Sequence, residues 1–406
     1  MNEYPARAVL EGVPRVHFYE GGERCPEDII LPSVMRALLE YLDSQGRGSR
    51  DYGCKHCLAQ NPDCKILCTY AYLVGVSGAA SFLSWKEGWH GDNPAIFYMS
   101  DDAEAPERNI CEAIGYEYKT VVAVKEKDRE NEALFRQLIR DSIHQGLPVL
   151  AYGVIGPPEP SIIAGYDEGG DVLLGWSFFQ SFPEFSAGVE FEPAKDGQPS
   201  GYFRKRDWFK ETEGLLILGE RKAKPSLVET FCNALEWMLK VTRTPMLKPD
   251  PDAPERYQHR HNGLAAYDAW AEHLLRDAEW PAEDEAVLRA HYQIHNDVTG
   301  TLAEARWYGS VFLSQVVEGF AAGPGTRGTQ AEILHAAACY AAEHDLMWNV
   351  WELAGGINNP EAYRGMADPG VRRAMADIVF QARDQDAQAA EHIERALGPR
   401  TYARYQ

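Results

Sequence analysis

Apolar and polar positions divide the chain into a mixed first half and a helical second half. In residues 146–180, short apolar runs separated by breakers predict three strands, over Pro148–Gly153, Ser161–Tyr166 and Asp171–Phe179. The last two are joined by Asp167-Glu168-Gly169-Gly170, whose glycines favour a tight turn because glycine tolerates a positive φ. We expect the first half of the chain to fold around this hairpin.

Helical periodicity flanks these strands. Apolar residues recur every three or four positions after Ser33 and again over Asn131–His144, which predicts two amphipathic helices. Further strands are predicted at Tyr118–Val124 and Gly214–Leu218. Strands and helices mix without a regular βαβ alternation, so the pattern indicates an α+β fold rather than a doubly wound sheet.

The second half has an almost continuous helical period, and its Pro and Gly residues are confined to connectors. The predicted helices are Ser226–Thr242, Gly263–Arg276, Glu283–Glu318, Thr329–Gly355 and Pro369–Leu397. This pattern is typical of an antiparallel helical bundle. We therefore predict two domains, an α+β domain over residues 1–222 and an all-α domain over residues 223–406.

The charge balance narrows the classes of partner. The 406 residues include 61 acidic and 40 basic side chains, for a net charge of −21, which disfavours binding to nucleic acid or an anionic membrane. No apolar run approaches the roughly 18 residues that span a bilayer. The first residues, MNEYPARAVLEG, lack the basic and apolar regions of a signal peptide. We expect a cytoplasmic protein.

Four cysteines lie close together in the first half, at Cys54, Cys57, Cys64 and Cys68. Tetrahedral zinc needs four such ligands, but the middle gap is shorter than in common zinc ribbons and fingers. Cysteines in a cytoplasmic protein are usually reduced and often act as small buried apolar residues. We favour structural thiols over a zinc site and expect no cofactor.

Two other groups of residues are candidate sites. Trp85, Trp89, His90 and Asp92 combine aromatic and polar groups in one loop, which suits a small-ligand pocket, although tryptophans in a capped loop more often fill a core. In the helical half, Glu332-x2-His335 matches one part of the di-iron carboxylate motif. That motif requires two copies, and only one is clear, so a surface role for these residues is favoured.

A family resemblance rests on the hairpin and on the helix after Ser33. Ser161-Ile-Ile-Ala-Gly165-Tyr166-Asp167, followed by Gly-Gly and Val172-Leu-Leu, resembles a strand pair of the papain-like cysteine peptidases, in particular bacterial double-glycine peptidases and the N-terminal domain of the butirosin biosynthesis protein H family. SVMRALLEYL resembles their central helix, and Tyr72–Gly78 and Gly115-Tyr116 resemble later turns of the butirosin-type domain. Over about residues 10–220 the resemblance implies a papain-like fold. It also implies amide hydrolysis, or acyl transfer from a carrier protein to an amine.

The positions that this resemblance assigns to the catalytic triad carry other residues. Ser33 and Val34 stand where the nucleophilic Cys would begin the helix, and Ser161 stands where the His would begin the strand. Trp176 lies where an orienting Asp or Asn would follow. A Cys–His mechanism needs a thiolate, a base and a group that orients the base. The resemblance therefore implies a degenerate triad.

Three functions follow as hypotheses. The first is an inactive groove that binds a peptide or a small amide-like metabolite, with Trp85, Trp89, Asp92, Glu159 and Tyr166 as candidate ligand-binding residues. The helical domain would then cover the groove or form a homodimer.

The second hypothesis is a cysteine-dependent acyltransferase or amidohydrolase that uses Cys68 or Cys25 with His90 as a displaced pair. The third is a structural protein in which the cysteine cluster binds a metal ion.

Overall fold

In the computed structural model, the chain forms two compact units. Unit 1 comprises Met1–Asp51 and Cys111–Lys224, and unit 2 comprises Tyr52–Ile110 and Pro225–Gln406. The described residues are 4–16, 27–47, 62–122, 129–194, 201–247, 260–320 and 327–398, with the backbone alone for 62–68 and 129.

The predicted boundary near residue 222 coincides with a boundary between the units, but residues 52–110 need reassignment. The sequence pattern predicts them in the first domain, whereas the structure groups them with the helical unit. The reason is packing, because α2 (Pro62–Ser77) lies along α8 (Glu285–Gly319) and α6 (Leu227–Arg243). The second unit is therefore built from two separate stretches of the chain.

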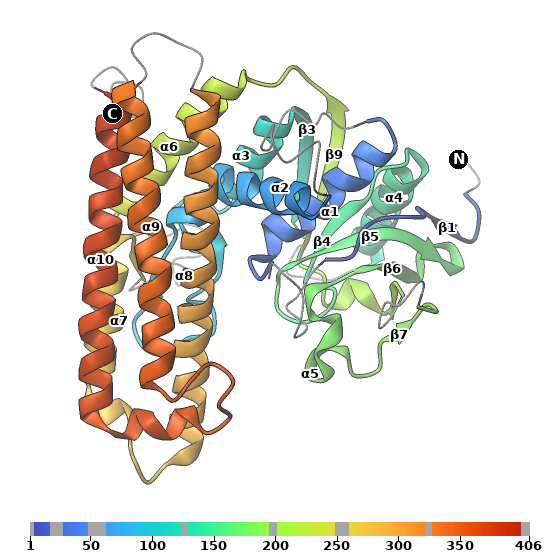
Figure 1. The fold of residues 1–406 in the computed structure, drawn as a ribbon. Coiled ribbons are helices and arrows are strands. Elements are labelled where there is room, and N and C mark those ends of the chain that lie inside the picture. Colours follow the sequence, from blue (N-terminus) through green and yellow to red (C-terminus); the bar gives the residue numbers. More distant parts are fainter. Residues whose placement is uncertain are drawn as a thin grey trace. The chain divides into compact units, whose positions relative to one another are not determined.

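Unit 1 is α+β, as predicted, and is built on an antiparallel sheet (Figure 1). Its strands follow the order β3-β9-β4-β5-β6-β8-β7, and β1 pairs with β5 beyond the end of β4. The strands are β1 (Ala8–Val9), β3 (Tyr116–Val122), β4 (Val149–Tyr152), β5 (Pro160–Asp167), β6 (Val172–Trp176), β7 (Glu190–Phe191), β8 (Phe203–Arg206) and β9 (Gly214–Arg221). The helices are α1 (Ile30–Ser44), α4 (Arg129–His144) and the short α5 (Pro183–Ser186), while α3 (Ala105–Ile114) crosses the chain boundary between the units.

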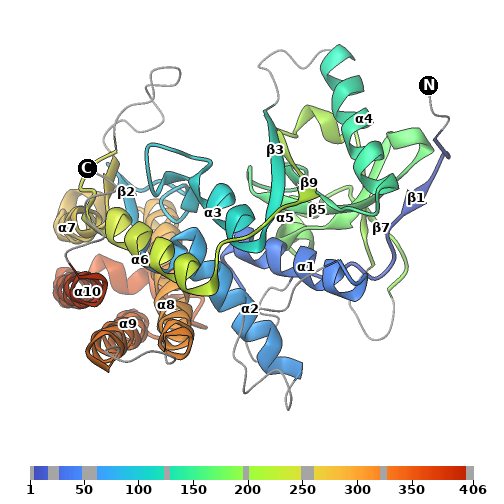
Figure 2. The ribbon, with the colours of Figure 1, turned by 90° about the horizontal axis from the view of Figure 1, so that it is seen from above.

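The two long helices of unit 1 cover opposite faces of the sheet (Figure 2). The apolar face of α4, including Phe135 and Ile139, packs against Val149, Ala151 and Leu215 of the central strands. On the other face α1 packs against β5 and buries an apolar stripe that includes Val34 and Leu38. Both helices were predicted from their apolar spacing, and both are confirmed.

The predicted hairpin is confirmed as β5 and β6. Its turn contains three successive residues with positive φ, namely Glu168 (50°), Gly169 (68°) and Gly170 (104°). A register shift interrupts the pairing between Ile163 and Gly165. A Cβ atom at Gly165 would lie 2.5 Å from the Ala8 carbonyl oxygen, so β1 can pair here only because position 165 is glycine.

Unit 2 is helical, as the periodicity predicted. Its long helices α7 (Leu264–Leu275), α8, α9 (Arg327–Leu353) and α10 (Pro369–Leu397) lie side by side and are seen end-on in Figure 2. α10 packs between α9 and α7, and α9 packs along α8. A small antiparallel pair, β2 (Ser84–Lys86) with β10 (Arg260–Asn262), was not predicted. Among the described residues, no helix is long and apolar enough to cross a membrane.

A fully buried charged group ties the bundle helices together. Arg306 on α8 donates hydrogen bonds to Glu343 on α9 and to Asp386 on α10, each over 2.9 Å, and to the Ala80 carbonyl over 2.7 Å. Tyr267 on α7 also donates to Asp386, over 3.1 Å. Burial raises the pKa of Glu343, although the Arg306 charge opposes this shift. Removal of one partner from such a group leaves a buried charge unpaired, which is strongly destabilising.

Candidate functional site

The head of α1, where the resemblance places a nucleophile, is enclosed and fully hydrogen-bonded. The Ser33 hydroxyl donates to Glu27 Oε2 over 3.0 Å, and Arg36 Nε donates to the same oxygen over 2.7 Å. Arg36 also bonds Glu40 over 2.8 Å. Ser33, Glu27 and Arg36 are all buried, and Val34 is part of the core. None of these residues presents a free nucleophile.

The charge on Arg36 is maintained by its neighbours. Burial alone would lower the pKa of Arg36, but the Glu27 and Glu40 carboxylates raise it above its ordinary value. Sequence reasoning did not identify this cluster. The available signal was a basic residue, Arg36, within the apolar stripe of a helix and four positions before an acidic one.

The structure does not bring the predicted position of the base toward the head of α1. Ser161 on β5 lies directly opposite Ala151 on β4, so the two side chains share a face of the sheet. Ala151 belongs to the core under α4, whereas α1 lies on the other face (Figure 2). Ser33 and Ser161 therefore lie on opposite faces. The Ser161 hydroxyl is buried and has no hydrogen-bond partner among the described residues.

Trp176, at the predicted orienting position, holds the N-terminal segment. It pairs with Ile162 and so lies on the α1 face of the sheet, and its Nε1 donates to the Val13 carbonyl over 2.9 Å. Tyr202 accepts from the Val13 amide over 3.1 Å and donates to the Leu10 carbonyl over 3.0 Å. The polar ends of both aromatic side chains are therefore bound to the main chain.

Arg36 completes this arrangement. Its Nη2 donates to the Arg15 carbonyl over 2.9 Å. Residues 10–15 thus extend from Tyr202 and Trp176 at one end to the buried Arg36 of α1 at the other. Val13 in this segment and Val16 after it are buried. A segment of the chain itself thus lies between Arg36 of α1 and Trp176 of β6.

Glu159 and Tyr166, two predicted ligand-binding residues, lie at opposite ends of β5. Glu159 is half-buried at the end of the loop before the strand, and burial raises the pKa of its carboxyl group to about 7. The Tyr166 hydroxyl lies 2.9 Å from His144 Nε2 and donates to the Pro5 carbonyl over 3.3 Å. Tyr166 therefore fastens the N-terminal residues to α4, and Glu159 keeps a titratable group at the edge of the core.

The other predicted ligand-binding residues belong to β2, where the sequence predicted a loop from Trp85 onward, and to the loop that follows β2 in unit 2. Trp85 is fully buried and stacks on Trp270, with ring centroids 6.1 Å apart. Trp89 packs edge-on against Trp85 and donates through Nε1 to Glu279 over 2.7 Å. Asp92 accepts from the buried Arg260 over 2.7 Å. Trp85 is therefore part of the core of unit 2, and Trp89 packs against that core. This agrees with the interpretation that these tryptophans fill a core rather than line a ligand pocket.

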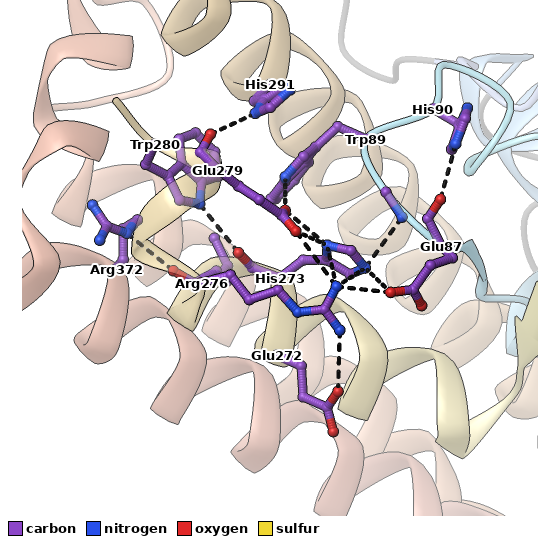
Figure 3. A network of polar contacts seen from close by, with 12 residues as sticks. Glu87, Trp89, His90, Glu272, His273, Arg276, Glu279, Trp280, His291 and Arg372 are labelled. Atoms are coloured by element: carbon purple, nitrogen blue, oxygen red, sulfur yellow. Dashed lines mark hydrogen bonds and ion pairs between the residues drawn. The ribbon is translucent and has the colours of Figure 1, made fainter. Parts of the chain in front are cut away.

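His273 lies at the centre of a polar network beside this loop (Figure 3). Its Nε2 accepts from the Gly88 amide over 3.1 Å, so its proton is on Nδ1, which donates to Glu279 over 2.8 Å. Arg276 donates to Glu87 over 2.7 Å, and this hydrogen bond holds the pKa of Glu87 below its ordinary value. Because Nε2 is already occupied, His273 is arranged to hold the loop rather than to accept a substrate proton. Sequence reasoning missed it, and no motif marked it.

The alternative Cys–His pair stays a prediction. His90 is partly exposed, and its Nε2 lies 2.9 Å from the Glu87 carbonyl oxygen (Figure 3). Cys25 and the side chain of Cys68 lie outside the described residues, as do Cys54, Cys57 and the side chain of Cys64. Within the described part of the chain the free thiols are Cys111, Cys232 and Cys339.

Burial and neighbouring carboxylates make two of these thiols less reactive. Burial, reinforced by nearby glutamates, raises the pKa of Cys232 above its ordinary value. Burial also raises the pKa of Cys339, reinforced by Glu343 and Asp386. Since the thiolate is the reactive form, both environments are opposite to that of an activated nucleophile.

No family model matches this chain, and no curated protein is significantly similar to it in sequence.

Proposed function

We propose that unit 1 is a papain-like domain that has lost its catalytic pair and that recognises a peptide or a small amide-like metabolite. The observation that carries the proposal is the binding of residues 10–15 by Trp176, Tyr202 and Arg36 through main-chain atoms. These contacts use peptide carbonyls and an amide, which every peptide offers regardless of its sequence. A groove with such donors and acceptors suits amide-containing ligands.

The absence of catalysis is supported by the enclosed head of α1. The Ser33 hydroxyl donates a hydrogen bond to Glu27, whose carboxylate is already paired with Arg36. Activation of a hydroxyl requires a base that withdraws its proton, and a carboxylate neutralised by a guanidinium is a poor base. Ser161, the second serine of the predicted triad, faces α4 on the other side of the sheet. Ser33 therefore lies beside a poor base, and Ser161 lies on the opposite face of the sheet from Ser33.

In this account the N-terminal segment is an internal occupant of the groove that an external peptide would replace. Main-chain amides of the segment also bond to the sheet: the Leu10 amide donates to the Ala164 carbonyl over 2.7 Å, and the Val13 amide donates to Tyr202. Gly12, between them, has a φ of 82° and an open surrounding. An external ligand must compete with a tethered segment whose effective concentration is on the order of millimolar.

Hydrogen exchange of the intact chain tests this proposal. A synthetic peptide with the sequence of residues 8–16, added at millimolar concentration, should accelerate exchange of the Leu10 and Val13 amides, because it displaces the internal segment. The Glu213 amide, which donates to Tyr152 in the same sheet over 2.8 Å, serves as the internal control and should not change.

A peptide of the same composition in scrambled order separates recognition of the main chain from recognition of side chains. If the main-chain contacts carry recognition, it should retain part of the effect. Unchanged exchange at Leu10 and Val13 at every peptide concentration would overturn the proposal, because the segment would then be a fixed part of the fold. The carrier protein and the homodimer stay predictions.

A further inference from the structure

Glu332, His335 and His392 form a group of metal-ligating side chains in unit 2. One ligand atom from each of the three lies within 4.8 Å of the other two. Glu332 and His335 are three positions apart on α9, and His392 is on the neighbouring α10. We propose that these residues bind one divalent transition-metal ion of the Zn²⁺ type.

The donor set selects the class of metal. Two imidazoles and one carboxylate suit Zn²⁺, Co²⁺, Ni²⁺ and Cu²⁺, whereas Mg²⁺ and Ca²⁺ prefer oxygen ligands alone. With metal–ligand bonds of about 2.0–2.2 Å, ligand atoms around a tetrahedral ion lie roughly 3.3 Å apart. The present separations require only small side-chain movements, and Glu332 and His392 are partly exposed and able to make them.

The contacts of His392 are in conflict, and a metal ion resolves the conflict. Its Nδ1 lies 2.7 Å from Glu332 Oε2 and 2.8 Å from Arg395 Nη2. A protonated Nδ1 can donate to the carboxylate but repels the guanidinium donor, and a deprotonated Nδ1 accepts from the guanidinium but faces a carboxylate lone pair. A cation between His392 and Glu332 uses both lone pairs at once.

Arg395 is the competitor that such an ion must displace. It donates to Glu332 over 2.8 Å and occupies the carboxylate oxygen nearest to His392. Its side chain is about half exposed, and Glu391, four positions earlier on the same helix, is a second partner at 3.5 Å. Arg395 can therefore turn toward Glu391 when an ion binds, without leaving its charge unpaired.

The site differs from the di-iron centre considered for Glu332-x2-His335. Di-iron carboxylate sites project their ligands into the bundle core and use two such motifs. Here His335 is exposed, and His392 on α10 supplies the third ligand in place of a second motif. Three protein ligands suit a single ion and leave one position for water or an external ligand.

Zinc titration of the intact chain tests the proposal, read by calorimetry and by competition with a chromogenic chelator. His335→Ala should weaken this site by roughly 100-fold or more, beyond the 10–100-fold typical of losing a residue that only supports a ligand. Arg395→Ala should tighten it, because the competing cation is gone. His335→Ala and Arg395→Ala should thus change the zinc affinity in opposite directions. Both side chains are partly or fully exposed, and general destabilisation of the fold cannot produce opposite changes.

His344→Ala is the matched control, because His344 is on α9 like His335 but is not one of the three proposed ligands. The His344→Ala variant should bind zinc with the same affinity as the unmodified chain. Zinc held by the cysteines near residue 60 would persist in every variant, so only the difference between variants reports this site. Identical stoichiometry and affinity in the unmodified, His335→Ala and Arg395→Ala chains would overturn the proposal. A thermal midpoint that Zn²⁺ raises in the unmodified chain but not in His335→Ala would support it.

Discussion

The Ser33 hydroxyl donates a hydrogen bond to Glu27 Oε2 over 3.0 Å, and the same oxygen accepts from Arg36 over 2.7 Å. The residue at the head of the helix is thus the donor to a carboxylate that is neutralised by its pairing with arginine. The carboxylate beside residue 33 is therefore a poor base for the activation of a nucleophile at this position.

This electrostatic argument predicts the outcome of Ser33→Cys. The new thiol would be buried, and burial raises the pKa of a thiol. We expect the thiol of this variant to react with iodoacetamide no faster than a buried cysteine such as Cys111. Mass spectrometry of alkylated peptides measures both rates in one sample. A thiol at position 33 that reacts faster than all others would contradict the argument.

Removal of Arg36 should strongly destabilise unit 1. Arg36→Met leaves the Glu27 carboxylate buried without its charge partner, which typically costs about 3–5 kcal/mol. Urea denaturation followed by tryptophan fluorescence measures this loss.

The double variant Glu27→Gln with Arg36→Met is the control. It carries no unpaired charge and should recover much of the stability. A double variant whose destabilisation equals the sum of the two single variants would show that the pair is not coupled.

Glu159 should make the stability of the protein depend on pH. Burial raises the pKa of its carboxyl group from 4.5 to about 7. The folded state therefore holds a proton that the unfolded state releases, and the contribution of Glu159 is fully present below about pH 4.5 and is lost as the pH rises through 7.

Glu159→Gln should flatten that part of the stability profile and raise stability at pH 8 by on the order of 1 kcal/mol. Urea denaturation at a series of pH values measures the change. Glu184→Gln, at an exposed position of unit 1, is the matched control and should preserve the slope. An unchanged slope in Glu159→Gln would assign the pH dependence to other groups, for example to the buried Glu343.

His273 should control the mobility of the loop that follows β2 and contains Trp89. Its Nε2 accepts from the Gly88 amide, and its Nδ1 is oriented by Glu279. In His273→Ala we expect faster hydrogen exchange of the Gly88 amide, while the Asn262 amide, which donates to the Pro245 carbonyl nearby, stays protected. Glu279→Gln should have a smaller effect, because the imidazole remains. Equal exchange of Gly88 in the unmodified and His273→Ala chains would contradict this role.

The sequence predicted those elements whose apolar period is long and regular. The bundle helices and α4 were placed within a few residues, and Pro369–Leu397 was placed at its observed bounds. The hairpin β5–β6 was predicted because Gly169 and Gly170 mark its turn. The association of residues 52–110 with the helical unit was not predictable, since it depends on packing between segments far apart in the chain.

The candidate site was less predictable for a similar reason. Periodicity placed Ser161 in a strand but did not give its face, which depends on the pairing of Ser161 with Ala151. The contacts of Trp176 and Tyr202 with residues 10–13 join positions more than 150 residues apart. No local pattern contains such information, and the same holds for His392 and Glu332.

The reactivity of the native cysteines tests most directly whether unit 1 has lost its catalytic pair. The eight thiols of the intact chain should react with iodoacetamide slowly and at comparable rates near neutral pH, and His90→Ala should change none of them. Quantitative mass spectrometry resolves all eight in a single time course. A Cys25 or Cys68 that reacts far faster than the rest, and that slows in His90→Ala, would contradict this account and establish the displaced Cys–His pair.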